Sequence, residues 1–188
     1  MCEADKDSGS TPVIWDTKER YGLVSALLHW VMAVAIFALF ALGLWMVRLD
    51  YYSPYYQSAP NLHRSAGIIL FAVLFLRIAW RLANIKPDRA ALTAFERRAS
   101  RVVHAAFYAL LVALMMSGYL ISTADGRSIE VFNWFSLPSP GKSEGLEDAA
   151  GFIHEWVAYA VMALAALHAA AAVKHRIVDR DKVSNRMW

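Results

Sequence analysis

The pattern of apolar and polar positions divides this chain into four long apolar stretches separated by polar segments. The stretches run roughly over Leu23–Val47, Leu62–Leu82, Val102–Ser122 and Gly151–Val173. Each has about the 20 residues that an α-helix needs to cross the hydrocarbon core of a bilayer. We therefore predict an all-α fold, an integral membrane bundle of four helices, rather than a soluble protein with a large core.

The polar segments suggest one membrane domain with a tail at each end. We expect residues 1–20 to form a polar, disordered cytoplasmic tail, residues 21–176 to form the transmembrane domain, and residues 177–188 to form a cytoplasmic tail. The turn Lys86-Pro87-Asp88 should end the second helix, because proline cannot continue it. Thr93–Ser100 is predicted to be a separate, short amphipathic helix on the cytoplasmic face.

The external segments contain the residues expected at a membrane surface. Ala124–Ala150 is the longest of these segments and is predicted to be a loop. Aromatic side chains gather at membrane–water interfaces, which is the role expected for Tyr51, Tyr52, Tyr55, Tyr56, Phe132, Trp134 and Phe135.

The basic residues indicate the orientation. If both termini are cytoplasmic, 15 of the 19 lysines and arginines fall inside, and only Arg48, Arg64, Arg127 and Lys142 fall outside. This distribution follows the positive-inside rule and predicts a multi-pass protein of a bacterial inner membrane. The net charge of +3 comes from the same inner loops, so we do not expect a nucleic-acid-binding protein.

Four histidines lie within the apolar stretches, where ionisable residues are rare and usually functional. His154 and His168 belong to the same predicted helix. At about 100° and 1.5 Å per residue, they face nearly the same way and are separated by roughly 21 Å. The predicted topology places His29 and His168 toward the cytoplasm, and His63 and His154 toward the outside.

Equal depth on different helices is the condition for two histidines to bind opposite sides of one haem iron. The sequence therefore predicts two haem b groups stacked across the bilayer, an inner one held by His29 and His168 and an outer one held by His63 and His154. Zinc fits less well, since two pairs so far apart cannot form one tetrahedral site. The single cysteine, Cys2, excludes both an internal disulfide and the Cys-x-x-Cys-His motif of covalently attached haem.

Three further residues are candidates with alternative roles. Arg77 lies on the His63 face but four turns further inward, where it could contact a haem propionate or extend to lipid headgroups. His104 is structural, or contacts a quinone or a propionate. His175 is expected to be solvated or near headgroups, with a quinone or proton-transfer role as the alternative.

These residues resemble the bacterial cytochrome b561 family of short four-helix, di-haem membrane proteins. The resemblance covers nearly everything from Tyr21 onward and rests on the segments Ser25–Trp30, Asn61–Gly67, Phe152–Trp156, Leu167–Ala171, Asn133–Phe135 and Asp181–Met187. It implies transmembrane electron transfer through two b-type haems. Some members of the family resemble superoxide oxidases that reduce ubiquinone, and others resemble membrane anchors of hydrogenases or other dehydrogenases.

The resemblance favours an oxidoreductase that takes electrons from superoxide, or another one-electron donor, at the outer face and reduces ubiquinone. An anionic donor needs a local positive patch, for which Arg64 and Arg127 are the candidates. One alternative is a non-catalytic conduit or anchor subunit, whose acidic stretch Glu144–Asp148 could receive a periplasmic redox partner. The other is a structural membrane protein without a cofactor.

Overall fold

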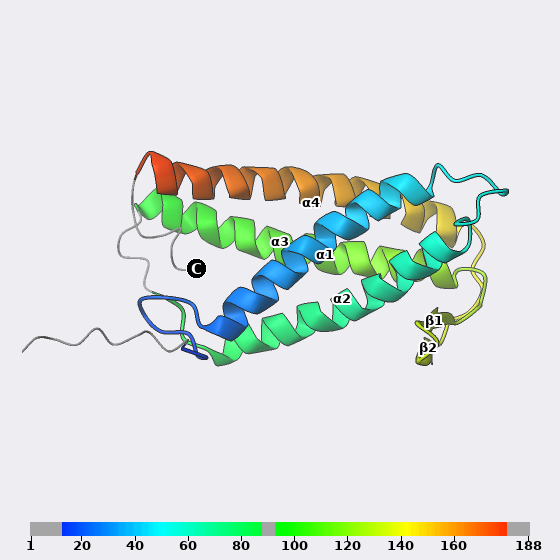
Figure 1. Cartoon of the computed structure of the whole chain (residues 1–188), viewed down its shortest axis with the longest axis horizontal. Helices are drawn as coiled ribbons and strands as arrows, with labels where there is room; N and C mark the ends of the chain where they lie inside the picture. Colours follow the sequence, from blue (N-terminus) through cyan, green and yellow to red (C-terminus); the bar gives the residue numbers. More distant parts are fainter. Residues whose placement is uncertain (1–12, 88–92, 180–188) are drawn as a thin grey trace, which may run out of the picture.

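Long helices make up most of the part of the chain that the structure describes (Figure 1). The computed structural model describes residues 13–87 and 93–179. The helices are α1 (Leu23–Met46), α2 (Ser58–Ala83), α3 (Ala94–Thr123) and α4 (Leu146–Ile177), and all four are long and apolar enough to cross a membrane. The prediction of an all-α membrane bundle is confirmed.

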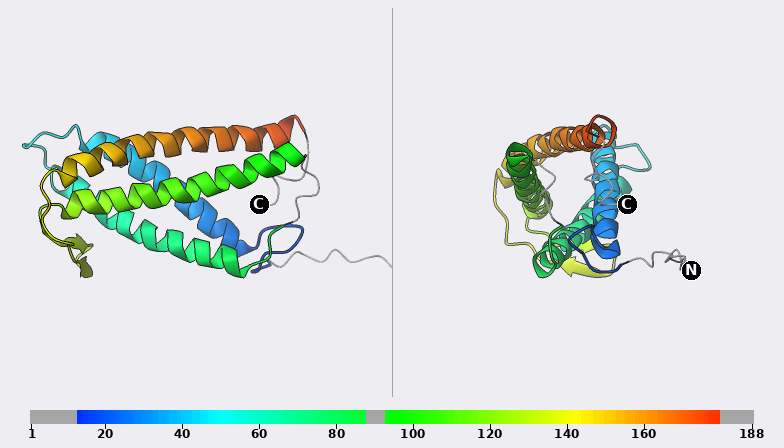
Figure 2. Two further views of the ribbon diagram at one scale, coloured as in Figure 1. Left: turned by 180° about the vertical axis from the view of Figure 1, so that it is seen from behind. Right: turned by 90° about the vertical axis from the view of Figure 1, so that its left-hand side faces the viewer.

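The helices are arranged around a common axis, which the end-on view in Figure 2 shows. α3 packs along α4, α1 packs along α2, and α2 also contacts α3. In the part of the chain that is described, the backbones of α1 and α4 do not pack closely, and the two helices meet through their side chains. These contacts are His29 with His168 and Phe40 with Tyr159.

The buried core is small and lies in the middle of the bundle. It consists of Met32, Leu70, Leu74, Leu111 and Val161, so each helix contributes. Val161 lies halfway between His154 and His168 along α4, which places this apolar layer midway between the two histidine depths. Many other large apolar side chains of the helices are exposed, among them Val34, Phe75 and Leu167, as expected where lipid takes the place of water.

The start of α3 differs from the sequence prediction. Thr93 caps the helix by a reciprocal capping box with Glu96, and the helix then runs without interruption from Ala94 to Thr123. The prediction of a separate helix over Thr93–Ser100 was wrong, because there is no glycine or proline between Thr93 and Val102 to interrupt the helix. At 1.5 Å per residue, α3 is about 45 Å long, so it is longer than the bilayer core.

The segment between α3 and α4 contains a small hairpin, whereas the sequence predicts only a loop there. β1 (Ile129–Val131) pairs antiparallel with β2 (Phe135–Leu137). Phe132 and Asn133 both have positive φ at the turn, as a tight hairpin turn requires. The hairpin is fixed to α2 by Ser65, which donates a hydrogen bond to Glu130 O and accepts one from Phe132 N, each of 3.2 Å.

Residues 13–22 form a strap that packs against the N-terminal end of α1 and the C-terminal end of α2. Asp16 is buried and accepts hydrogen bonds from Gly22 N at 2.7 Å and Ser25 Oγ at 2.9 Å. Trp15 stacks on Trp80 with ring centroids 4.9 Å apart. The sequence interpretation placed residues up to 20 in a tail, whereas those from 13 onward have defined contacts. The expected turn at Asp88 and the C-terminal tail beyond Asp179 lie outside the described residues.

Gly22 allows the strap to approach its own helix closely, because a Cβ atom at this position would overlap the backbone of Ile14 and Trp15. We predict that Gly22→Ala detaches the strap and speeds tryptic cleavage at Lys18 and Arg20 in detergent-solubilised protein, as followed by mass spectrometry. Gly67→Ala is the control, since a Cβ atom at Gly67 meets nothing within 4 Å. Equal cleavage rates for the two variants would contradict the close packing of the strap.

Candidate functional site

The four membrane histidines form two facing pairs. His63 of α2 faces His154 of α4 with ring centroids 6.2 Å apart and ring planes at 71°. His29 of α1 faces His168 of α4 with centroids 6.4 Å apart and planes at 75°. The residues brought together are those that the depth argument paired, and we keep its predicted depths as names: the outer pair is His63 with His154, and the inner pair is His29 with His168.

The spacing of each pair suits a metal ion with one imidazole on either side. Bonds between a metal ion and an imidazole nitrogen are about 2 Å long, so the two bound nitrogens would be about 4 Å apart. Each ring centroid lies further from the metal ion than the bound nitrogen does, so the centroids must be more than about 4 Å apart. The observed centroid separations of 6.2 and 6.4 Å therefore suit such an ion. The donor set therefore fits a haem iron with two axial histidines.

At the outer pair, glycines leave room for the rings and a backbone carbonyl orients one of them. A Cβ atom on Gly118 of α3 would come within 3.0 Å of His154 Cε1, and one on Gly43 of α1 within 3.3 Å of His63 Cε1. His154 Nδ1 lies 2.9 Å from Leu114 O and 3.2 Å from Ser117 Oγ. His63 Nδ1 is buried and has no hydrogen-bond partner among the described residues.

At the inner pair, a cation and a third histidine lie close by. Arg77 Nη2 is 3.0 Å from His29 Nδ1, so the guanidinium points into the bundle and not toward lipid headgroups. The ring of His104 is 5.7 Å from that of His168, and His104 Nδ1 is 2.6 Å from Ser100 O. Phe107 contacts the edge of the His168 ring at 5.6 Å. Arg77 and His104 are therefore both part of the surroundings of the inner pair.

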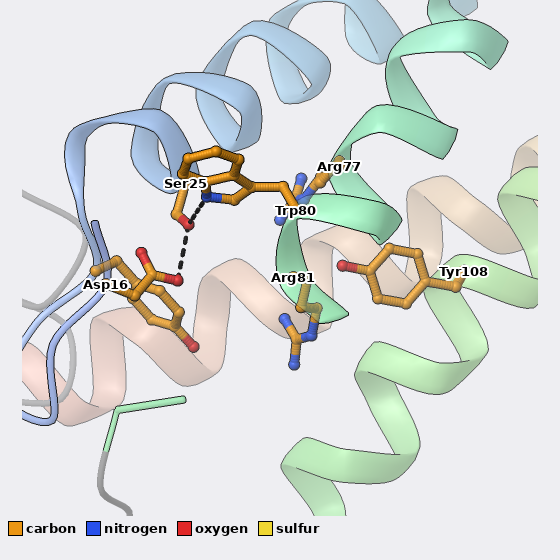
Figure 3. A pocket seen from close by; sticks show the side chains of 7 residues that line it. Asp16, Ser25, Arg77, Trp80, Arg81 and Tyr108 are labelled. Carbon is orange, nitrogen blue, oxygen red and sulfur yellow. Dashed lines mark hydrogen bonds between the residues drawn. The ribbon is translucent and has the colours of Figure 1, made fainter. Parts of the chain in front are cut away.

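Beside the inner pair, a narrow polar cleft of about 20 Å³ opens between the strap, α1, α2 and α3, and Figure 3 shows it from close by. It has room for about one water molecule. Trp80 Nε1 donates to Ser25 Oγ at 3.1 Å, and Ser25 donates in turn to Asp16. The hydroxyl of Tyr108 is buried and has no hydrogen-bond partner among the described residues. The cleft is lined by Asp16, Tyr21, Ser25, Arg77, Trp80, Arg81 and Tyr108.

Sequence reasoning identified Arg77 but gave no role to Asp16, Ser25 or Tyr108 of this cleft. Ser25 and Tyr108 could have been noticed as polar residues within apolar stretches. Asp16 gave no such signal, because it lies in a segment whose composition is typical of a disordered tail.

His175 lies apart from the two pairs, in an ion-pair network at the N-terminal end of α3 and the C-terminal end of α4. Its Nδ1 is 3.1 Å from Asp179 Oδ2, and Lys174 Nζ lies 2.6 Å from the same oxygen. Lys174 also approaches Glu96 of α3 at 3.7 Å. Glu96, His175 and Asp179 are close enough to suggest a metal site, but the Lys174 ammonium already lies within 4 Å of both carboxylates. The network links two helix ends.

Comparison with known proteins identifies the family of this chain. The family model described as prokaryotic cytochrome b561 matches residues 20–188. Cytochrome b561 homolog 2 of Escherichia coli strain K12 is 45% identical over 176 residues, covering 92% of this chain and 93% of that protein. Cytochrome b561 homolog 1 of the same strain is 25% identical over 172 residues, covering 89% of this chain and 96% of that protein. The chain therefore belongs to the prokaryotic cytochrome b561 family, and it is a membrane electron-transfer protein that binds b-type haem.

Proposed function

We propose that the protein carries electrons across the bacterial inner membrane by means of two haem b groups, each with two histidine ligands. His63 and His154 hold the outer haem, and His29 and His168 hold the inner one. The observation that supports this proposal most directly is the presence of two histidine pairs with matched separations of 6.2 and 6.4 Å. One helix, α4, supplies a histidine to each pair.

A bound haem supplies a centre that accepts and releases one electron, and the chain supplies the conditions for this exchange. With an imidazole on each side, as these histidine pairs would supply, a haem iron would have no position open for dioxygen. The packed layer around Met32, Leu74 and Val161 excludes water between the two pairs. Arg77 can pair with a haem propionate beside the inner pair, since a guanidinium binds a carboxylate through two parallel hydrogen bonds.

The proposed orientation places both termini in the cytoplasm. The domain then extends over residues 21–176, with the inner pair, Arg77 and Arg81 on the cytoplasmic side. The hairpin and the tyrosines from Tyr51 to Tyr56 are on the outer side. The support comes from the distribution of basic residues, of which 15 of 19 lie inside in this orientation.

The substrates that we propose are superoxide outside and ubiquinone as the acceptor. Two superoxide ions each lose one electron and become dioxygen, and one ubiquinone takes up two electrons and two protons. A positive charge near the outer pair would attract superoxide. Arg64 follows His63 directly and donates a hydrogen bond to Asn61, and the exposed Arg127 is paired with Asp125 at 2.5 Å. Arg64 is thus the better placed of the two candidates.

The alternative is a conduit, or a membrane anchor subunit, that takes electrons from a periplasmic protein. One observation favours it: the hairpin is bonded to Ser65, close to His63 on α2, and its tip residue Trp134 is 75% exposed. A partner protein that bound this tip would be close to the outer haem. The acidic stretch Glu144–Asp148 offers a second contact on the same side.

We predict that each histidine pair serves one haem. The pyridine haemochrome of the wild-type protein should give two haems per chain. His63→Ala or His154→Ala should abolish the outer haem or convert it to high spin, because each removes an axial imidazole, and should spare the inner one. His29→Ala or His168→Ala should do the reverse, as judged by optical and EPR spectra. Damage to the same haem in His63→Ala and His168→Ala would disprove the pairing.

Gly118→Ala should disturb the outer haem alone. The added Cβ atom would lie 3.0 Å from His154 Cε1 and force that ring away from its position. The helix itself should tolerate the change, because alanine favours helix over glycine by about 1 kcal/mol. We expect one low-spin haem spectrum to shift or disappear, whereas Gly151→Ala, where a Cβ atom meets nothing within 4 Å, should leave both spectra unchanged. An unaltered outer haem in Gly118→Ala would show that the ring is not tightly confined.

The purified protein should reduce ubiquinone with superoxide in the absence of any partner protein. Quinol formation in detergent, driven by xanthine oxidase under aerobic conditions, measures this activity, and added superoxide dismutase should abolish it. Arg64→Gln should slow the reaction several-fold at low salt, since steering by charge weakens as ionic strength rises. Full haem content without any superoxide-dependent quinol would instead favour the conduit.

A further inference from the structure

The two histidine pairs have opposite electrostatic surroundings. We propose that these surroundings give the inner haem a higher reduction potential than the outer haem, so that electrons move inward with a gain in free energy. The proposal rests on the haem positions given under Proposed function. It assigns the direction of electron flow to two features of this chain: the Leu114 carbonyl at the outer pair and the Arg77 guanidinium at the inner pair.

At the outer pair, the partner of His154 makes that ligand a stronger electron donor. A histidine that binds a metal through one ring nitrogen usually donates the remaining N–H to an acceptor, and this raises the basicity of the ligand. His154 Nδ1 is 2.9 Å from Leu114 O, which can only accept. A more basic ligand stabilises ferric over ferrous iron and therefore lowers the potential of the outer haem.

The charged groups near the outer end do little to offset this effect. Arg64 donates an exposed hydrogen bond to Asn61. Arg127 is paired with Asp125, and the side chains of Arg127 and Asp125 are 85% and 39% exposed. Exposed charges are screened by solvent and salt. Among the described residues, no lysine or arginine contacts His63 or His154 in a way comparable to the contact of Arg77 with His29.

At the inner pair, Arg77 supplies a cation that is partly buried. Its Nη2 is 3.0 Å from His29 Nδ1, and its Nη1 is 3.9 Å from Met32 Sδ. Arginine stays charged at any physiological pH, and a charge acts more strongly where water is excluded. A nearby positive charge favours the reduced iron, which has one positive charge fewer, and therefore raises the potential of the inner haem.

The hydrogen-bonding capacity of Arg77 indicates where its guanidinium goes when His29 binds iron. A metal on the other ring nitrogen leaves a proton on His29 Nδ1, and arginine has only donors to offer. The guanidinium must then turn to an acceptor close by, either the hydroxyl of Tyr108, which has no partner among the described residues, or a haem propionate. In both cases its charge stays beside the inner pair. Pairing with a propionate also cancels a negative charge that would favour ferric iron.

The other charged side chains that line the cleft do not reverse the positive charge beside the inner pair. Arg81 adds a second cation, whose guanidinium carbon lies 5.8 Å from the centre of the Tyr108 ring. Among the described residues that line the cleft, Asp16 is the one carboxylate, and its oxygens accept hydrogen bonds from Gly22 N and Ser25 Oγ. Two guanidinium groups against one carboxylate leave the inner site positive.

The test is potentiometric titration of variants that keep a single haem. His63→Ala retains the inner haem and His168→Ala retains the outer haem, and we expect the higher midpoint potential in His63→Ala. Adding Arg77→Gln should lower the midpoint in the His63→Ala background and leave it unchanged in the His168→Ala background. Arg77→Lys, which keeps the positive charge, should leave the midpoint potential of the inner haem close to its value with Arg77. An inner midpoint at or below the outer one would overturn the proposal, as would an inner midpoint unaffected by Arg77→Gln.

A titration of the two-haem protein provides a second measurement that needs no histidine variant. Arg77→Gln in the otherwise unchanged chain should lower only the higher of the two midpoints, and a shift of the lower midpoint would overturn the proposal. Failure of the proposed function has a different signature, because haem would then be absent or bound without two histidine ligands, as the haemochrome assay and EPR spectra report.

Discussion

The arrangement of this protein depends on placing four imidazoles at two depths inside a narrow helical bundle. α4 sets both depths, because it carries His154 and His168 on nearly the same face, about four helical turns apart. α2 and α1 then have to bring His63 and His29 to those levels, which they do with centroid separations of 6.2 and 6.4 Å. The side-chain contact between α1 and α4, whose backbones do not pack closely, follows from this requirement.

The rest of the bundle supports the two pairs in different ways. Gly43 and Gly118 leave space for the outer rings, and the Leu114 carbonyl orients one of them. The inner pair is surrounded by Arg77, His104 and the cleft beneath the N-terminal strap. Between the pairs lies a layer of apolar side chains from all four helices. The two ends of the bundle therefore offer a metal centre unlike electrostatic environments, and this difference is the physical basis for a direction of electron transfer.

Much of this architecture could be predicted from the sequence, because the membrane imposes strong rules. A span needs about 20 apolar residues, and basic residues favour the cytoplasmic side, so the order of the helices gave the relative depths of His29, His63, His154 and His168. The inward position of Arg77 followed from its spacing to His63. These arguments use only the rise of a helix and the thickness of a bilayer.

Other features depended on contacts between distant residues and could not be predicted. Asp16 belongs to a polar segment, and only its hydrogen bonds with Gly22 and Ser25 show that it is part of the fold. The hairpin at Phe132 and Asn133 is held by Ser65 of α2, which lies far earlier in the chain. The partners of the histidine Nδ1 atoms, on which the difference between the two ends rests, are set by the rotation of each helix within the bundle. Hydrophobic periodicity defines that rotation only approximately.

The central claim is that each facing pair of histidines binds one iron. Anomalous diffraction at the iron absorption edge, from crystals of the purified protein, tests this most directly because it locates iron without assumptions about the ligands. We predict two iron peaks per chain, one between His63 and His154 and the other between His29 and His168. A single peak, or a peak that lies between any other residues, would contradict the claim.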